Sequence, residues 1–192
     1  MQQKKVVFFF PAFSSQEATA PLGILAVSTP LLRAGYQVKI IDSTITPNFQ
    51  KRVLAEVEDA ICLCVSLVTG PMIRETVAMA RAVKSQYPDL PIVLGGWHPS
   101  LLPDQTLAAE YVDVVVVVIG ASEGIRRRIF CASCKRSRPK FLPCGRPHRS
   151  ASHPLPASHK RDLRFRKLRE LHRILLFFPS GSISGKFQFQ MA

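Results

Sequence analysis

The stretch from Cys62 to Pro103 decides the fold, and its sequence is CLCVSLVTGPMIRETVAMARAVKSQYPDLPIVLGGWHPSLLP. It opens with an apolar run, which is typical of a strand covered on both faces of a sheet. A helical pattern follows, with Pro71 near its first turn and an apolar stripe that ends before Pro88. A second apolar run then stops at two glycines. Strand, helix and strand in this order predict a right-handed crossover between parallel strands.

The same alternation continues on both sides of this stretch. We predict strands at 4–10, 36–42, 60–66, 90–96 and 112–120, and helices at 21–36, 51–60, 70–88 and 103–111. Five strands that alternate with helices indicate an α/β fold, a flavodoxin-like or Rossmann-like doubly wound parallel sheet. Gly35 suits the end of the first helix, whereas Pro30 is expected to kink or split it. The valine-rich run at 112–119 should be paired and largely buried.

In such a sheet, ligands bind beyond the carboxyl ends of the strands, where the strand order reverses. With strand order 2-1-3-4-5, the loops at 11–20, 66–70 and 95–100 border that crevice. Gly95 and Gly96 allow a backbone to approach a large ligand closely, Ser66 and Thr69 offer hydroxyl groups, and the side chains at 97 and 98 could cover a bulky ring. Neither a P-loop nor the G-x-G-x-x-G dinucleotide motif occurs.

Each of these residues also has a plain structural interpretation. The glycines could serve only the turn after a strand, and the two hydroxyl residues could only cap the next helix. Trp97 could be a core residue and His98 an exposed loop residue. The combination favours a binding site because all of these residues fall on one edge of the predicted sheet.

Three segments resemble a known family: APLGILAVSTPLLRAGYQVKIID, CVSLVTGPMIRETVAMARAVKSQYPDLPIVLGGWHPSLLPDQTL and YVDVVVV. They look like the N-terminal cobalamin-binding domain of B12-dependent radical SAM proteins, and the likeness covers roughly residues 4–120. The resemblance implies a Rossmann-like domain with cobalamin against the carboxyl ends of its strands. It further implies that the site is lined by Ser66, Leu67, Thr69, Gly70, Gly95, Gly96, Trp97, His98 and Pro99.

The sequence departs from related patterns at two places. Mutase-type B12 domains carry Asp-x-His-x-x-Gly after the first strand, but PAFSSQEATAPLG at 11–23 contains no histidine, which excludes a histidine ligand to cobalt from this loop. The Cys-x-x-x-Cys-x-x-Cys motif of radical SAM barrels is absent, because Arg127 stands four residues before Cys131. A [4Fe–4S] cluster and S-adenosylmethionine are therefore expected only in full-length relatives, and this chain is not expected to be catalytic alone.

The net charge of +13 is concentrated at one end of the chain. Residues 1–120 carry 9 Lys and Arg against 10 Asp and Glu, while residues 121–192 carry 17 against 3. We therefore divide the chain into a cobalamin-binding-like α/β domain at 1–120 and a basic tail at 121–192, rich in Arg, Pro, Ser and Cys. Its dense like charge predicts poor order and no independent fold.

Three interpretations of the tail remain open. It could be a frame-shifted translation of a longer gene, since it begins where the family resemblance ends. It could hold zinc through Cys131, Cys134, Cys144 and His148, whose spacing matches no finger that we can assign. It could also bind nucleic acid or a membrane surface through a cationic amphipathic helix near 161–178, whose apolar stripe comprises Leu168, Leu171, Leu175 and Phe178.

Two functions from different classes follow. The first is a cobalamin-binding module without catalysis of its own, and the alternative is a nucleic-acid- or membrane-surface-binding protein that acts through the tail. Lys4 and Lys5 before an apolar run imitate a signal peptide, but Pro11 interrupts the run early and a strand is the better interpretation. We expect a cytoplasmic protein with no transmembrane segment and no specific nucleic acid partner, and its oligomeric state is not predicted.

Overall fold

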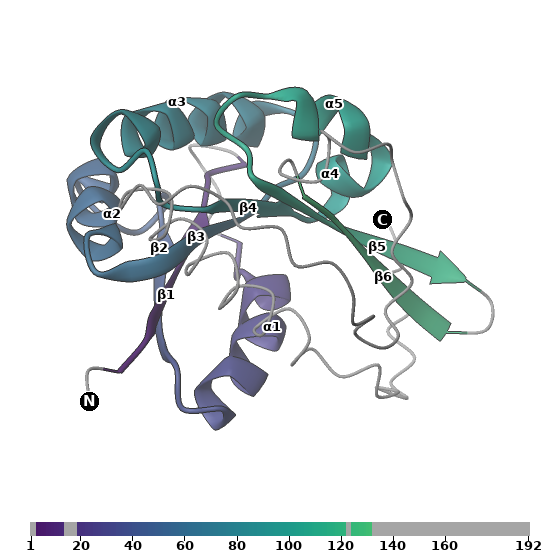
Figure 1. The fold of residues 1–192 in the computed structure, drawn as a ribbon, viewed down its shortest axis with the longest axis horizontal. Coiled ribbons are helices and arrows are strands. Elements are labelled where there is room, and N and C mark those ends of the chain that lie inside the picture. Colours follow the sequence, from purple (N-terminus) through teal and green to yellow (C-terminus); the bar gives the residue numbers. More distant parts are fainter. Residues whose placement is uncertain (1–2, 14–18, 122–123, 132–192) are drawn as a thin grey trace, which may run out of the picture.

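The protein forms a six-stranded sheet flanked by helices, in the strand order β2-β1-β3-β4-β5-β6 (Figure 1). The computed structural model describes residues 3–13, 19–121 and 124–131. The strands are β1 (Lys5–Phe10), β2 (Gln37–Asp42), β3 (Ala60–Ser66), β4 (Ile92–Gly95), β5 (Val114–Ala121) and β6 (Gly124–Cys131). The first five strands pair in parallel, which confirms the predicted flavodoxin-like fold.

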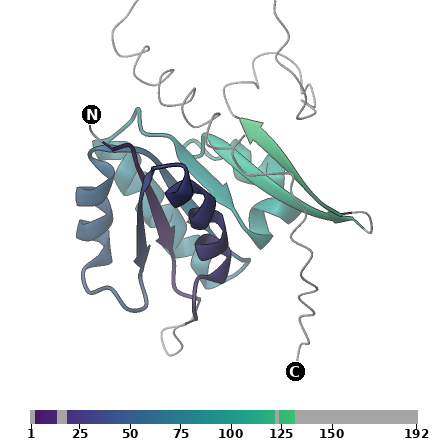
Figure 2. The ribbon, with the colours of Figure 1, turned by 90° about the horizontal axis from the view of Figure 1, so that it is seen from below.

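The helices cover the two faces of the sheet unequally. They are α1 (Leu22–Arg33), α2 (Phe49–Val57), α3 (Pro71–Gln86), α4 (Trp97–Leu101) and α5 (Pro103–Ala108). Helix α1 lies on one face, and α2 to α5 lie on the other (Figure 1). Seen from below, α1 lies over the β1 side of the sheet, and the β5–β6 hairpin extends beyond it (Figure 2). Helix α1, which connects β1 to β2, lies on one face, and α2, which connects β2 to β3, lies on the other. The strand order therefore reverses between β1 and β3.

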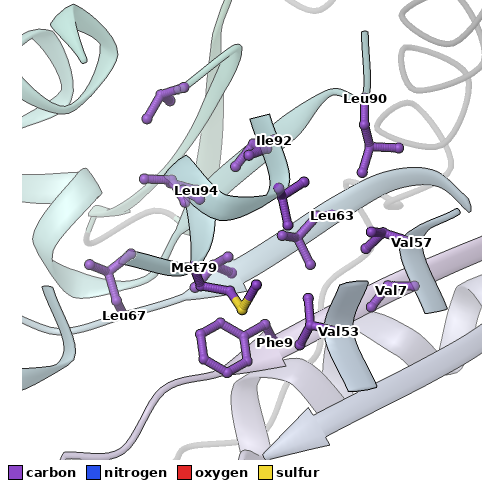
Figure 3. Close-up of a cluster of buried hydrophobic side chains, with 14 of the residues drawn as sticks. Val7, Phe9, Val53, Val57, Leu63, Leu67, Met79, Leu90, Ile92 and Leu94 are labelled. Atoms are coloured by element: carbon purple, nitrogen blue, oxygen red, sulfur yellow. The ribbon is translucent and has the colours of Figure 1, made fainter. Parts of the chain in front are cut away.

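Two apolar clusters, one on each face, hold these layers together. The larger one joins β1, β3, β4 and β5 to α2 and α3, with Phe9, Leu63, Met79 and Leu94 among its buried members (Figure 3). The smaller one packs α1, through Ile24 and Leu31, against the other side of the same strands. Burial of this apolar surface is the main force that fixes the helices on the sheet.

Helix α1 runs unbroken through Pro30, so the expected split does not occur. The missing N–H of Pro30 leaves the Ala26 carbonyl without its usual helical donor. At the preceding residue, the Leu25 carbonyl accepts the hydroxyls of both Ser28 and Thr29 at 3.0 Å. The helix ends at Arg33, close to the predicted end at Gly35, which has φ of +83° and allows the Tyr36 amide to donate back to Leu31.

Strand β5 begins at Val114, two residues later than the start predicted from the valine-rich run. Val114, Val115 and Val117 are buried, as a strand inside a sheet requires, and β4 pairs with it in parallel. Its other neighbour, β6, was not expected from the sequence. It pairs antiparallel with β5 from Val114↔Cys131 to Ala121↔Gly124, so the sheet continues past residue 120.

Ion pairs fasten the amino ends of the strands. Lys84 of α3 donates at 2.6 Å to Asp113, which also accepts the Ile92 amide at 2.9 Å. Lys5 of β1 bonds to both Asp59 and Glu56. Burial works against the charge on Lys5, but its hydrogen bonds to these two carboxylates prevail and raise its pKa. The bond to Lys5 lowers the pKa of Asp59.

Several predictions fall on residues that the structure does not describe. Of the proposed zinc ligands, Cys134, Cys144 and His148 lie outside the described residues, as does the predicted amphipathic helix near 161–178. Among residues 3–13, 19–121 and 124–131, no group of three or more potential metal ligands comes together. Within the same part of the chain, no helix is long and apolar enough to cross a membrane.

Candidate functional site

The predicted site residues gather at the carboxyl ends of β3 and β4. Ser66 ends β3 and pairs in register with Gly95, the last residue of β4. The next residues, Leu67 and Gly96, continue from the two strand ends, and the Leu67 amide donates to the Gly95 carbonyl at 3.0 Å. Two loops that are far apart in sequence therefore form one continuous backbone edge.

The residues after this edge form a short helix rather than the expected loop. Gly96 precedes α4, and Trp97 and His98 occupy its first turn. The His98 amide donates to the Leu67 carbonyl at 3.3 Å, and His98 Nδ1 lies 3.2 Å from Thr69 Oγ1. The turn after β3 and the start of α4 are thus held together by one backbone and one side-chain contact.

The two glycines have different roles in this arrangement. Gly96 has φ of +97°, and a Cβ built there would lie 2.6 Å from the Leu67 carbonyl oxygen and 2.9 Å from its nitrogen. Such contacts leave no room for any side chain. A Cβ at Gly95 would meet nothing closer than Val116, at 3.8 Å. Gly96 is therefore required by the fold, whereas the space beside Gly95 can accept other atoms.

Small residues line the α1 face of the sheet at this edge. Ser66 and Gly95 are paired in register, and Val116 lies beside Gly95 on the next strand. Val116 also packs against the α1 cluster, which places this row on the α1 side of the sheet. All three residues are half-buried. The row forms a shallow strip at the carboxyl edge where no large side chain projects from β3 or β4.

Trp97 is 66 % exposed, which rules out the interpretation that it is a core residue. Because it begins α4 at the same edge, its ring is available to a ligand placed there. Leu67 and Pro99 are buried instead, and the Leu67 side chain belongs to the large cluster on the opposite face (Figure 3). These two predicted site residues can contact a ligand at the α1 face only through their backbone, or support it from behind.

Neither hydroxyl residue caps the helix that follows. The residue before α3 is Gly70, with φ of +125° and no side-chain cap bond, and Thr69 contacts His98 instead. Gly70, Pro71 and Arg74 line a hollow of about 240 Å³ at the start of α3. A second cavity, of about 160 Å³, lies behind His98 between α3 and α5, and its lining includes Leu67, Thr76 and Tyr111.

Two other polar groups near the site have structural roles. Asp42 accepts both the amide and the hydroxyl of Thr44 and so stabilises a local turn after β2. Cys62 and Cys64 lie on β3 with their sulfur atoms 3.8 Å apart. Contact with Cys62 and burial raise the pKa of the Cys64 thiol, which favours its protonated form.

Comparison with known proteins gives one family match. A family model described as the B12 binding domain matches residues 12–130, which include the whole edge described above and most of β6. No curated protein matches the chain.

Proposed function

Because the chain belongs to the B12 binding domain family, we propose that it binds cobalamin at the carboxyl edge of its sheet, with part of the cofactor against the α1 face of β3 and β4. The single observation that carries this proposal is the missing side chain at Gly95, where an added Cβ would fit without a clash, in ordinary contact with Val116 at 3.8 Å. Small residues at this edge fit a bulky group that must approach the backbone closely. The bound cofactor would supply a cobalt centre that forms and breaks bonds to carbon.

The chain's own residues would hold and orient the cofactor. Ser66 offers a hydroxyl next to Gly95, and the Thr69–His98 pair holds the two turns together at the same edge. Trp97 offers a flat apolar surface for the corrin or its side groups, because its ring is exposed. Gly70 and Gly96 shape the two turns by their positive φ angles, and Leu67 and Pro99 pack behind them.

We further propose that the chain acts as the cobalamin-binding module of a B12-dependent radical SAM system. This finer assignment rests on the wording of the three segments at 4–120, and on the absence of a histidine between residues 11 and 23. Reaction chemistry would then come from another domain or protein, with this chain as the carrier of the cofactor.

Equilibrium dialysis of the full chain with methylcobalamin tests the proposed binding. The methylated form is chosen because histidines outside the site, such as His153, exchange readily onto hydroxocobalamin and would give a false signal. Gly95→Leu should weaken binding at least about tenfold, equivalent to about 1.4 kcal/mol, because its side chain fills the strip. Ala55→Leu, which introduces the same side chain at an exposed position on α2, serves as the matched control.

Cobinamide, which lacks the nucleotide tail, provides a second comparison. If the strip beside β3 and β4 holds that tail, cobinamide should bind more weakly than cobalamin to the wild type. The difference in affinity between wild type and Gly95→Leu should also be smaller for cobinamide than for cobalamin. Failure of the wild-type chain to bind methylcobalamin at millimolar concentration would overturn the proposed function. Equal binding by wild type and Gly95→Leu would show that the site lies elsewhere.

A further inference from the structure

One carboxylate links three elements at the carboxyl edge of the sheet. Glu75 lies in the second turn of α3, and its Oε2 atom accepts the Ala12 amide at 2.6 Å and the Ser43 hydroxyl at 2.7 Å. Ala12 follows β1 and Ser43 follows β2, so the donors are 63 and 32 residues away from Glu75 in sequence. Hydrogen bonds to an ionised carboxylate are short and about twice as strong as those between neutral groups.

The Ala12 contact fixes the first part of the loop that follows β1. This loop, at 11–20, borders the crevice where the strand order reverses. The Ser43 amide also donates to the Phe10 carbonyl at 3.0 Å, which ties the ends of β1 and β2 to each other. Glu75 then ties both ends to α3, the helix that starts from the turn at Thr69 and Gly70. One side chain therefore sets where the loop departs relative to the proposed cofactor site.

The packing of α3 does not depend on Glu75. The helix is held on the sheet by Met72, Thr76, Met79, Ala80 and Val83, all of which are buried. Glu75 is half-buried and flanks this stripe. Removal of the Glu75 side chain should therefore leave α3 in place and release only the backbone at Ala12. An effect of such a variant on binding can then be assigned to the position of the loop rather than to the core.

From this geometry we propose that Glu75 is a positioning residue for cobalamin binding, which holds the start of the loop after β1 in the conformation that the cofactor requires. The inference rests on the proposed function. Without the carboxylate, the Ala12 amide and the Ser43 hydroxyl lose their common acceptor, and the backbone at Ala12 must be fixed each time the cofactor binds. The cost of that ordering should appear as weaker affinity and faster release.

The test compares Glu75→Leu with Glu75→Gln in the full chain, using methylcobalamin in equilibrium dialysis. Glu75→Leu should bind at least about tenfold more weakly, because both hydrogen bonds are lost. Glu75→Gln should bind within about threefold of wild type, because its amide oxygen can accept both donors, although without the charge. Hydrogen exchange of the Ala12 amide should rise in Glu75→Leu and stay slow in Glu75→Gln.

Asp113→Asn provides the control for general loss of stability. Asp113 also accepts two donors on one oxygen, but it does so at the amino ends of β4 and β5, away from the site. If Asp113→Asn lowers the melting temperature as much as Glu75→Leu and still binds cobalamin normally, weaker binding by Glu75→Leu reflects position rather than stability. If both variants weaken binding equally at equal loss of stability, the role assigned to Glu75 is wrong.

The outcomes also separate this inference from the proposed function. If the wild-type chain binds no cobalamin, the proposed function fails, and the role of Glu75 in it fails too. If the wild type binds and Glu75→Leu binds equally well, only the role of Glu75 fails. If Glu75→Leu and Glu75→Gln are equally impaired, the charge rather than the position of the loop matters, and the proposal is again overturned.

Discussion

His98 Nδ1 lies 3.2 Å from Thr69 Oγ1, and this contact joins the turn after β3 to the start of α4. The two residues are 29 positions apart in the sequence. The sequence predicted that the loops at 66–70 and 95–100 lie at one edge, at the carboxyl ends of neighbouring strands. This contact shows that the two loops do meet there. The predictions below test this edge and the fold that supports it.

Gly95 and Gly96 should respond differently to the same substitution. Gly96→Ala should lower the free energy of unfolding by about 2–4 kcal/mol, because a Cβ there meets the Leu67 backbone and φ is positive. Gly95→Ala should cost less than about 1 kcal/mol, since the nearest atom lies 3.8 Å away. Urea denaturation followed by circular dichroism measures both. Equal losses would contradict the geometry of the edge.

Trp97 should report the bound cofactor through its fluorescence. It is the chain's single tryptophan, and it is exposed beside the proposed site. Cobalamin absorbs where tryptophan emits, so binding should quench the emission with the same midpoint that dialysis gives. The matched control moves the tryptophan to α2, in the double variant Trp97→Phe/Ala55→Trp, where quenching should be weaker because energy transfer falls steeply with distance. Stronger quenching in the control would place the cofactor away from α4.

The ion pair between Lys5 and Asp59 should make stability depend on pH at both extremes. The pKa of Lys5 is raised above its usual 10.5, so its contribution is complete below 10.5 and is lost as the pH rises through the raised value. The pKa of Asp59 is lowered below its usual 3.8, so its contribution is complete above 3.8 and is lost as the pH falls through the lowered value.

Thermal denaturation from pH 2.5 to 11.5 measures this dependence, with Lys5→Met as the comparison. The difference in melting temperature between wild type and variant should be constant near neutral pH and should shrink toward both ends. A difference that is the same at all pH values would show that Lys5 contributes through packing alone. Lys39→Met serves as the control, because its contact with Glu56 is long, at 3.9 Å, and partly exposed.

Strand β6 should be needed for a stable sheet. A chain that ends at residue 131 keeps the pairing of β5 with β6, whereas one that ends at 121 exposes the β5 edge, whose residues include Val115 and Val117. The shorter chain should unfold at lower denaturant concentration and should aggregate. Light scattering and urea denaturation of the two chains check this expectation. Equal solubility and stability would mean that β6 adds nothing to the fold, and that the domain ends near residue 120 as the charge distribution suggests.

The sequence alone determined the order of the first five strands and the sheet edge where we place the proposed site. Apolar runs such as the one from Ala60 to Ser66 differ from the helical stripe at 71–86 in their period, and that difference depends only on neighbouring residues. Parallel pairing and the reversal of strand order then follow from general rules of chain connection. For this reason the five parallel strands, the helix end at Gly35 and the meeting of residues 66–70 with 95–100 were predictable.

Only the tertiary structure decided how individual residues are used at that edge. It sets Gly96 apart from Gly95, turns Leu67 into the core, exposes Trp97, pairs β6 with β5 and brings Glu75 to Ala12 and Ser43. The position of Glu75 beside a buried helical stripe was only a weak sign of its contact with Ala12 and Ser43, since most glutamates at such positions face water. These outcomes depend on distances between segments tens of residues apart, and a local pattern carries no information about them until the chain has folded.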